Sequence, residues 1–571
     1  MITDPNYSSW YFADSETTKT YEPPFILSSF YPAELKLFTK DVVELVPDQV
    51  PKLIHSSIRT QPSLAGVLLL EQNKTYGRNE TKKRLLYKCI PDDKHLPTFL
   101  VPYEIKLGFT KHMKNKYVTF KFDHWTQQHP HGILVEVLGD VDNLDVFYEY
   151  QLYCKSLHVS MTDFTNKTRN MLKQHTNDEY IQLIAANPQY NIQTVCSNTN
   201  YIFTIDPPTS TDYDDAFSIM PRGNNYVVSI YIANVYFWLE TLDLWKSFST
   251  RVSTIYLPDR KRPMLPTILS DTLCSLQENQ SRFAFTLEMV IDGTTFEIVP
   301  ESMTFRNTLV RVSKNYAYED VMLLDNPHYQ TLFRIASSID KSVKDSHDMV
   351  AFWMILMNRL CGEKMAQDTV GIFRAMSFIK EPMDHLLPLN IVDDSRRVIS
   401  MWNNTYGQYC LLSETSDTQH QMMKLKSYIH ITSPIRRLVD LLNQMIFIDH
   451  YKIVTKLSPD ATSFLTYWIN QLEYINTTMR SIRKVQTDCE VLRKCTSVPE
   501  IINSIHQGII FDKVQKNDGT YSYMVYLEHP KMLMRLNSLM CLDNYSNHTF
   551  KLFVFEDENH IRKKIKLEMI A

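Results

Sequence analysis

Four aspartates lie within ten residues of one another in the segment FTIDPPTSTDYDDAFSI, residues 203–219: Asp206, Asp212, Asp214 and Asp215. They surround a Pro-Pro turn that follows a short apolar strand. Like charges at this spacing repel and raise one another's pKa, so a folded site needs a counter-charge. Oxygen ligands without Cys or His favour magnesium or manganese over zinc. Two such ions about 3.5–4 Å apart would activate a water and stabilise both oxygens of a phosphodiester displacement.

The aspartate cluster has two other interpretations. A solvated acidic turn is the usual meaning of clustered aspartates, and it stays open on this segment alone. A calcium loop of the EF-hand type is poorly supported. Neither the glycine expected at its sixth position nor the glutamate expected at its twelfth follows from Asp206 or Asp212.

A second segment, SYIHITSPIRRLVD at residues 427–440, combines a helix start with two arginines. Ser433 and Pro434 predict a helix N-terminus with serine as the cap and proline in the first position. Its free N–H groups would face an anion. Arg436 and Arg437 would lie in the first turn, where cations oppose the helix dipole, so they need an anionic partner such as phosphate or the aspartate cluster. The alternative is a surface ion pair with Asp440.

A third segment, residues 253–285, is a proline-rich loop between predicted strands. Its basic run, Arg260 to Arg262, would contact phosphate or form a solvated loop. Tyr256 would stack on a base or fill the core. Neither choice follows from the segment alone.

Composition limits what kind of chain carries these segments. Its 571 residues are 44% hydrophobic and 12% aromatic, which predicts about three or four folded domains rather than disorder. The net charge of −4 lacks the basic signature of a duplex-coating protein, so contact with nucleic acid would be local. Nine cysteines without a CxxC pair predict free thiols in a reduced compartment. No leader and no apolar run of about 18 residues is evident, so we expect an intracellular protein without a membrane span.

The elements that must position the segments alternate between strand-rich and helical stretches. Five short strand patterns over 62–160 predict a small barrel. There, alternating lysines and aromatics form either an RNA platform or a solvated face over a core (Lys111, Lys114, Lys116, Tyr117, Phe120, Phe122). We predict a helix over 32–44, strands over 195–310, and helices over 327–365 and 420–494. After Pro499, an Asn-Asp-Gly turn at 517–519 between apolar runs predicts a hairpin of a second barrel.

Taken in order, the three segments resemble a known family. The series TIDPPTSTDYDDA, then YLPDRKRPMLPTILSDTLCSL with Arg282, then YIHITSPIRR, is similar to the catalytic domain of the ribonuclease II (RNB) exoribonucleases. The resemblance is to the eukaryotic branch that includes the catalytic subunit of the exosome. Residues 65–157, with IPDDKHLP, FDHW and HPHGILVEVLGDVDN, are similar to the second N-terminal OB domain of that branch.

This resemblance implies an α+β multidomain protein in which an RNB domain, a mixed sheet with helices, is flanked by small OB-type β-barrels. The implied divisions are an unassigned segment (1–60), a cold-shock-like OB barrel (61–165), the RNB catalytic domain (195–500) and a C-terminal RNA-binding OB barrel (505–571).

The resemblance also implies an activity. The implied activity is that of a metal-dependent 3′→5′ exoribonuclease, which degrades single-stranded RNA to nucleoside 5′-monophosphates. The implied cofactor is Mg²⁺ or Mn²⁺, and an RNA-decay complex is an implied further partner. Position by position, the four aspartates of residues 206–215 match metal-site carboxylates, and Arg436 matches the arginine that stabilises phosphate charge. We expect Asp206, Asp212 and Asp215 to hold one ion, while Asp214 helps a second ion or orients the water.

Three further residues are implied to bind RNA. Tyr256 and Tyr318 match aromatic positions that look like base-stacking or clamping residues. Arg437 would contact backbone phosphates or pair within the protein.

The chain departs from the family pattern near both chemical segments. IANVYFW, with Asn234 and Phe237, stands where the family reads I-A-D-V-S-H-F. Asn443 and Gln444 lie in the stretch after the arginine pair, where the family carries histidine and arginine. These changes motivate a second hypothesis, a catalytically weak or inactive RNA-binding regulator on an RNB fold.

Overall fold

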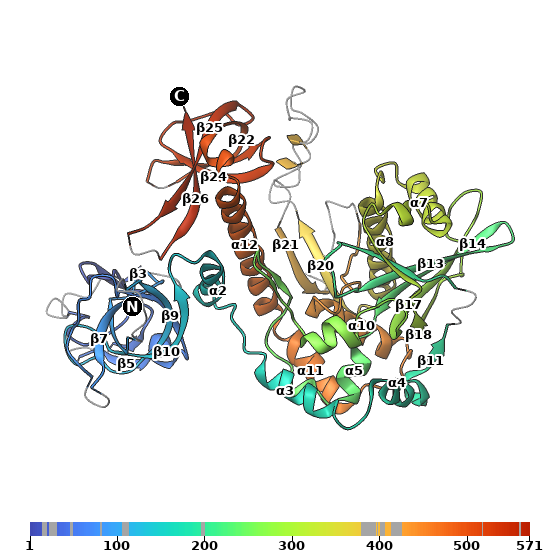
Figure 1. Ribbon diagram of the computed structural model, residues 1–571, viewed down its shortest axis with the longest axis horizontal. Helices are drawn as coiled ribbons and strands as arrows, with labels where there is room; N and C mark the ends of the chain where they lie inside the picture. Colours follow the sequence, from blue (N-terminus) through green and yellow to red (C-terminus); the bar gives the residue numbers. More distant parts are fainter. Residues whose placement is uncertain are drawn as a thin grey trace.

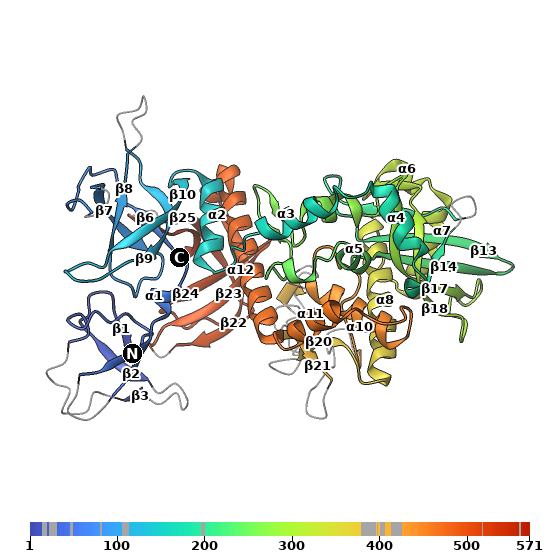
Figure 2. The same ribbon diagram turned by 90° about the horizontal axis from the view of Figure 1, so that it is seen from below.

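The computed structural model contains two five-stranded sheets at one end of the molecule and a seven-stranded sheet with helices at the other (Figures 1 and 2). It describes residues 1–13, 20–21, 31–45, 50–79, 83–105, 113–195, 200–377, 395–396, 398–399, 406–412, 425–516, 518–558 and 561–570. Within these residues no helix has both the length and the apolar character needed to cross a membrane.

The N-terminal five-stranded sheet has the order β10-β9-β6-β7-β8, and all its strand pairs are antiparallel. A bridge between Leu100 and His131 joins its two ends and closes it into a barrel. Alternating residues fill the barrel with apolar side chains, as the period of a strand requires. The strands are β6 (Leu64–Leu68), β7 (Leu85–Pro91), β8 (Phe99–Tyr103), β9 (Lys116–Phe122) and β10 (Gly132–Asp140).

The lysines and aromatics that alternate in this region form a solvated face over a core. Tyr117 and Phe120 are completely buried, and neither offers a ring to a ligand. Lys114 forms an ion pair with Asp142, and Lys116 forms an ion pair with Asp140. Lys111 lies outside the described residues. Within the described residues, Tyr117 and Phe120 therefore belong to the core, and Lys114 and Lys116 form ion pairs at the surface.

The first sixty residues contain short strands and one turn of helix, and they pack against the barrel. Phe38 is fully buried and its ring lies 4.9 Å from that of Trp125. The helix predicted over 32–44 is wrong, because Lys36 and Lys40 take left-handed backbone angles (φ 57° and 68°) that interrupt a helix. Turns and one short strand, residues 42–44, occupy this range instead. The elements are β1 (Ile2–Thr3), β2 (Trp10–Ala13), β3 (Thr20–Tyr21), β4 (Val42–Glu44), β5 (Lys52–His55) and α1 (Ser57–Thr60).

The central sheet has the order β11-β18-β17-β14-β13-β12-β19. Its inner strands are antiparallel neighbours, whereas β11 with β18 and β12 with β19 run parallel. The inner strands are apolar on both faces, as expected of a sheet covered by helices. The bounds are β11 (Ile192–Thr194), β12 (Phe203–Asp206), β13 (Asp215–Arg222), β14 (Asn225–Ala233), β17 (Ser281–Ile291), β18 (Thr304–Arg311) and β19 (Lys314–Ala317).

Helices surround this sheet, and two hairpins complete the central region (Figure 1). The central and C-terminal helices share one apolar core with the sheet. The helices are α2 (Leu144–Cys154), α3 (Thr162–Met171), α4 (Asn177–Ala186), α5 (Tyr236–Thr241), α6 (Val321–Leu324), α7 (Pro327–Ile339), α8 (Ser346–Gln367), α10 (Leu438–His450), α11 (Pro459–Ile469) and α12 (Leu472–Ser497). The hairpins are β15 (Ile255–Tyr256) with β16 (Lys261–Arg262), and β20 (Ile372–Ser377) with β21 (Tyr406–Leu411).

The long helix α12 leads through α13 (Pro499–Asn503) into the C-terminal sheet (Figure 1). That sheet has the antiparallel order β24-β23-β22-β25-β26. The hairpin predicted around 517–519 is confirmed, since Gln515 pairs with Tyr521 and Gly519 takes a left-handed angle (φ 80°). The strands are β22 (Ile505–Gln515), β23 (Tyr521–Leu527), β24 (Met532–Ser538), β25 (Asn547–Glu556) and β26 (Lys563–Ile570).

Candidate active site

Three of the four clustered aspartates gather at one end of the central sheet. Asp206 is the last residue of β12, and Asp215 is the first residue of β13. Because the two strands are antiparallel, with Phe203 opposite Phe217, their Asp-bearing ends meet at the same edge. Asp214 and Asp215 are only 2% and 7% exposed. The fold therefore holds acidic side chains where charge is costly.

The electrostatics of these three carboxyls call for a cation. Burial raises the pKa of Asp214 to about 8 and that of Asp215 to about 6. Burial, followed by the charge of Asp215, raises the pKa of Asp206 well above its usual range. The Oδ2 atoms of all three are buried and accept no hydrogen bond. Buried acceptors without a donor are rare in folded proteins, and a bound divalent ion would satisfy them.

Asp212 differs from the other three because both of its oxygens have partners. Its Oδ1 accepts a hydrogen bond of 2.7 Å from Nζ of Lys261, and its Oδ2 lies 3.4 Å from the hydroxyl of Tyr256. Both partners belong to the β15–β16 hairpin. The sequence grouped Asp212 with the other three aspartates as one cluster. In the structure Asp212 differs from them, because each of the others keeps an oxygen that accepts no hydrogen bond.

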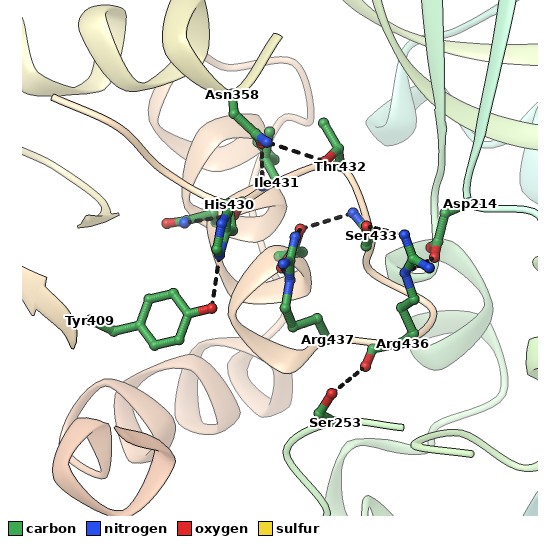
Figure 3. Close-up of polar contacts among 12 residues, drawn as sticks. Asp214, Ser253, Asn358, Tyr409, His430, Ile431, Thr432, Ser433, Arg436 and Arg437 are labelled. Atoms are coloured by element: carbon green, nitrogen blue, oxygen red, sulfur yellow. Dashed lines mark hydrogen bonds and ion pairs between the residues drawn. The ribbon is translucent and has the colours of Figure 1, made fainter. Parts of the chain in front are cut away.

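The segment over 427–437, which we call the arginine loop, meets the aspartates from the other side. Nε of Arg436 lies 3.2 Å from Oδ2 of Asp214, and the backbone N–H of Ile435 donates to Oδ1 at 2.9 Å. Figure 3 shows the guanidinium of Arg436 beside Asp214. The side chain of Arg436 is 48% exposed, so it also faces solvent, where a substrate would lie. The predicted meeting of an arginine with the aspartate cluster is present.

The predicted helix start at Ser433 is wrong. Residues 434–436 form a turn, Arg437 is extended (φ −143°, ψ 118°), and α10 begins at Leu438. The backbone of Arg436 is held by another segment, because its carbonyl accepts hydrogen bonds from Ser253 Oγ (3.0 Å) and Thr254 N (2.9 Å). This long-range pairing prevents the loop from joining the helix.

Arg437 faces away from the aspartates. Its Nη2 lies 2.8 Å from Oδ1 of Asp440, and the same oxygen accepts from the backbone N–H of Ser433 at 2.8 Å. Asp440 is fully buried, so this is an internal ion pair rather than the surface pair considered from sequence. The guanidinium of Arg437 is thereby engaged within the protein.

Three buried amides fix the arginine loop. Asn358 of α8 accepts a hydrogen bond from Ile431 N (3.0 Å) and donates to Thr432 Oγ1 (3.3 Å), as Figure 3 shows. Asn443 donates to the carbonyl oxygens of Ile372 and His430, both at 2.9 Å. Gln444 donates to the carbonyl of Ile431 at 3.4 Å and to one in β14. Two of the family departures therefore hold the loop in place.

Sequence reasoning missed Asn358. The available signal was one amide within the apolar run VAFWMILMNRL, where a buried polar group needs partners. The departures near β14 have packing roles: Asn234 donates to Asn307 at 3.2 Å, and Phe237 is fully buried.

Both tyrosines predicted to contact RNA lie next to the aspartates. Tyr256 is 42% exposed, and its hydroxyl reaches Asp212. Tyr318 donates its backbone N–H to the carbonyl of Asp206 at 3.1 Å, and its ring stacks on His347 with centroids 3.6 Å apart. Their positions suit aromatic contacts with a chain that ends at the carboxylates.

In the basic run at 260–262, Lys261 and Arg262 are paired with carboxylates, whereas Arg260 is exposed. Arg262 is buried and forms ion pairs with Glu149 of α2 (2.8 Å) and with Asp259. Hydrogen bonds from His158 and Arg262, despite burial, hold the pKa of Glu149 at about 2. Arg260 is largely exposed but lies 3.5 Å from the same glutamate. This network ties the helix after the N-terminal barrel to the hairpin at the site.

The donor set fits a hard divalent ion, since the unsatisfied groups are carboxylate oxygens without Cys or His. Asp206, Asp214 and Asp215 supply the Oδ2 atoms that accept no hydrogen bond, and that of Asp214 also faces Arg436 in an ion pair. Among the residues that the structure describes, no three His, Cys, Asp or Glu side chains converge as a formed metal-binding group.

Comparison with known proteins identifies the central region. A family model of the RNB domain matches residues 197–330 and 324–452. The chain carries an RNB domain. A model of the Dis3-like cold-shock domain 2 matches residues 86–150, in the N-terminal barrel. The predicted family and the α+β fold, an RNB domain with an OB-type barrel, are confirmed.

Curated relatives of this RNB protein are ribonucleases. Over 390 residues it is 25% identical to ribonuclease R of Chlamydia pneumoniae, which covers 54% of this chain and 56% of the relative. Over 254 residues it is 28% identical to DIS3-like exonuclease 2 of Schizosaccharomyces pombe, which covers 42% of this chain and 26% of the relative. The matches thus span about a quarter to a half of those relatives' own lengths.

Solved structures share the RNB-protein fold. Ribonuclease R of Mycoplasma genitalium, in its apo form, matches with a TM-score of 0.67 and 16% identity over 93% of this chain and 95% of that one. Yeast Ssd1, a pseudonuclease, matches with a TM-score of 0.56 and 15% identity over 87% of this chain and 67% of that one. At these identities the likeness establishes the fold alone.

Proposed function

We propose that this protein is a divalent-metal-dependent 3′→5′ exoribonuclease that hydrolyses single-stranded RNA to nucleoside 5′-monophosphates. The observation that carries the proposal is the meeting of Asp214 with Ile435 and Arg436, residues more than 220 positions later in the chain. This contact puts a half-exposed cation beside buried carboxylates with unsatisfied oxygens. The naming of its relatives as ribonuclease R and DIS3-like exonuclease supports RNA as the substrate.

The residues divide the chemistry between them. Asp206, Asp214 and Asp215 would hold the Mg²⁺ or Mn²⁺ ion, which when bound would activate water and stabilise the oxygens of the displacement. Arg436 is aimed at Asp214 and open to solvent, so it would stabilise charge that develops on the scissile phosphate. The three buried amides hold its loop and keep it in position. Arg437 supports the same loop through Asp440.

RNA would reach the site along aromatic side chains. Tyr256, which contacts Asp212, and Tyr318, which contacts Asp206, would stack on bases near the 3′ end. Ribonuclease R of Mycoplasma genitalium has been solved with double-stranded RNA and with ribose-methylated single-stranded RNA. A relative is the exosome complex exonuclease dis3 of Schizosaccharomyces pombe, which supports an RNA-decay complex as a partner. An RNA substrate and the free thiols of the described cysteines fit an intracellular location.

A second candidate function is an RNA-binding regulator without hydrolytic activity. The likeness to Ssd1, a pseudonuclease, favours it, as do the amides at 443 and 444. The retention of all four aspartates and of Arg436 favours the enzyme, because loss of activity removes the constraint on these residues first.

A time course with 5′-labelled single-stranded RNA tests the proposal. With Mg²⁺, we expect a ladder of 3′-trimmed products that collapses to a short end product, and no products with EDTA. Asp214→Asn should abolish hydrolysis while RNA affinity stays within about tenfold. Intact RNA across Mg²⁺ and Mn²⁺ concentrations, with a retained shift on a native gel, would establish the regulator instead.

A further inference from the structure

Lys261 has three acceptors within hydrogen-bond distance at the site. Its Nζ lies 2.7 Å from Oδ1 of Asp212, 2.7 Å from Oγ1 of Thr211 and 3.1 Å from Oδ1 of Asp271. An ammonium group has three N–H bonds, so these contacts use its full donor capacity. The side chain of Lys261 is 24% exposed and that of Asp212 is 9% exposed. This ion pair is therefore shielded from water and is stronger than a surface pair.

The surroundings hold Lys261 in this position. Tyr256 and Lys261 are direct partners across the β15–β16 hairpin, so both side chains reach Asp212 together. The far side is held by Asp271, whose two oxygens also accept hydrogen bonds from Ser270 (2.6 Å) and Thr211 (3.0 Å). The next residue of the hairpin, the buried Arg262, is anchored to α2.

The Oδ2 atoms of the other three aspartates are buried and accept no hydrogen bond. Asp214 does have partners, because its Oδ1 accepts from the backbone N–H of Ile435 and its Oδ2 faces the half-exposed Arg436 in an ion pair. An ion could bind these oxygens without breaking a hydrogen bond. To reach Asp212, it would first have to displace the ammonium of Lys261.

We propose that Lys261 is a positioning residue that fixes Asp212 as an ion-paired anion outside the coordination shell of the divalent ion. Asp206, Asp214 and Asp215 then hold the ion, and Asp212 orients Tyr256 beside it. This inference deepens the proposed function and rests on its metal site. It assigns different roles to carboxylates that are near neighbours in sequence.

Binding of Mn²⁺ alone, measured by electron paramagnetic resonance without RNA, tests the proposal. Lys261→Met with Asp212→Asn removes one positive and one negative charge together, so the net charge of the site is unchanged. We expect this double variant to bind Mn²⁺ within about threefold of wild type. Asp206→Asn should weaken binding by more than about tenfold, as loss of a ligand requires. Lys261→Met alone should tighten binding by about tenfold, because it removes a cation and frees Asp212.

Lys261→Arg keeps the charge and the ion pair, and should bind Mn²⁺ like wild type even if the methionine variants fold poorly. A loss in the double variant as large as that of Asp206→Asn would overturn the proposal, because Asp212 would then be a ligand. Unchanged affinity in Lys261→Met, or no Mn²⁺ binding by wild type, would also overturn it. If the binding pattern holds but RNA stays intact, the proposed exoribonuclease activity fails and the assignment of Lys261 stands.

Discussion

Asp214→Asn should abolish hydrolysis in the presence of the divalent ion and, in its absence, make the protein more stable. Asp214 is buried, and burial raises its pKa from 3.8 to about 8, so keeping it ionised costs free energy of folding. A residue retained for stability would behave in the opposite way. The combined change therefore distinguishes a carboxylate kept for chemistry from one kept for structure.

The size of the gain follows from the pKa shift. One pKa unit corresponds to about 1.4 kcal/mol, so at about pH 7.5 the full shift would cost about 5 kcal/mol. Asparagine keeps an acceptor for the N–H of Ile435, and the attraction of Arg436 is already included in the shifted pKa. Relaxation around a buried charge lowers the cost. We expect the variant to be more stable by about 2 kcal/mol in EDTA.

The pH dependence has a definite sign. A carboxyl with a raised pKa contributes stability that is fully present below its ordinary pKa of 3.8 and is lost as pH rises towards 8. The stability difference between Asp214→Asn and wild type should therefore grow between about pH 5 and pH 8. Urea unfolding in EDTA, followed by tryptophan fluorescence at several pH values, measures it.

Asp440→Asn is the matched control. Asp440 is also a buried aspartate, but it is paired with Arg437 and with the backbone N–H of Ser433. Breaking this buried pair should destabilise the protein by about 3 kcal/mol. The reasoning is refuted if Asp214→Asn is less stable than wild type at pH 7.5 in EDTA, or if the stability difference does not change with pH.

Four further predictions follow from the site and its supports. Glu149→Gln should lower the free energy of unfolding by about 3 kcal/mol, and the wild-type contribution, present above pH 4.5, should be lost as pH falls towards about 2, as thermal unfolding would show. Arg436→Met should lower kcat by about 100-fold with little change in RNA affinity, measured by single-turnover hydrolysis and filter binding. Asn358→Leu should reduce kcat and, by hydrogen exchange, loosen the arginine loop, because it leaves the N–H of Ile431 without its acceptor. EDTA should stop hydrolysis, and added Mg²⁺ should restore it.

Several elements were predictable because their signals are local. Strand alternation and turn residues are short-range patterns, and they located the strands of both five-stranded sheets and the hairpin at 517–519. The prediction of a helix over 32–44 failed because Lys36 and Lys40 take left-handed backbone angles that interrupt a helix. The helix start at Ser433 failed because the cap signal of Ser-Pro competes with hydrogen bonds from residues 253–254, about 180 positions earlier.

What the sequence by itself determined is the acidic segment and the kind of ligand that it offers. Four aspartates within ten residues must repel, and carboxylate oxygens are the ligands that hard ions prefer. The order of the three motifs was enough to identify the RNB family.

Only the tertiary structure decided which partner each charge received. It paired Asp214 with Arg436, Asp440 with Arg437, and Asp212 with Lys261. Sequence spacing places side chains along one strand or turn, whereas the partner of a buried charge depends on segments that folding brings together from distant parts of the chain. Because charge interactions in a shielded site depend steeply on distance and burial, neighbouring aspartates acquire different partners and environments.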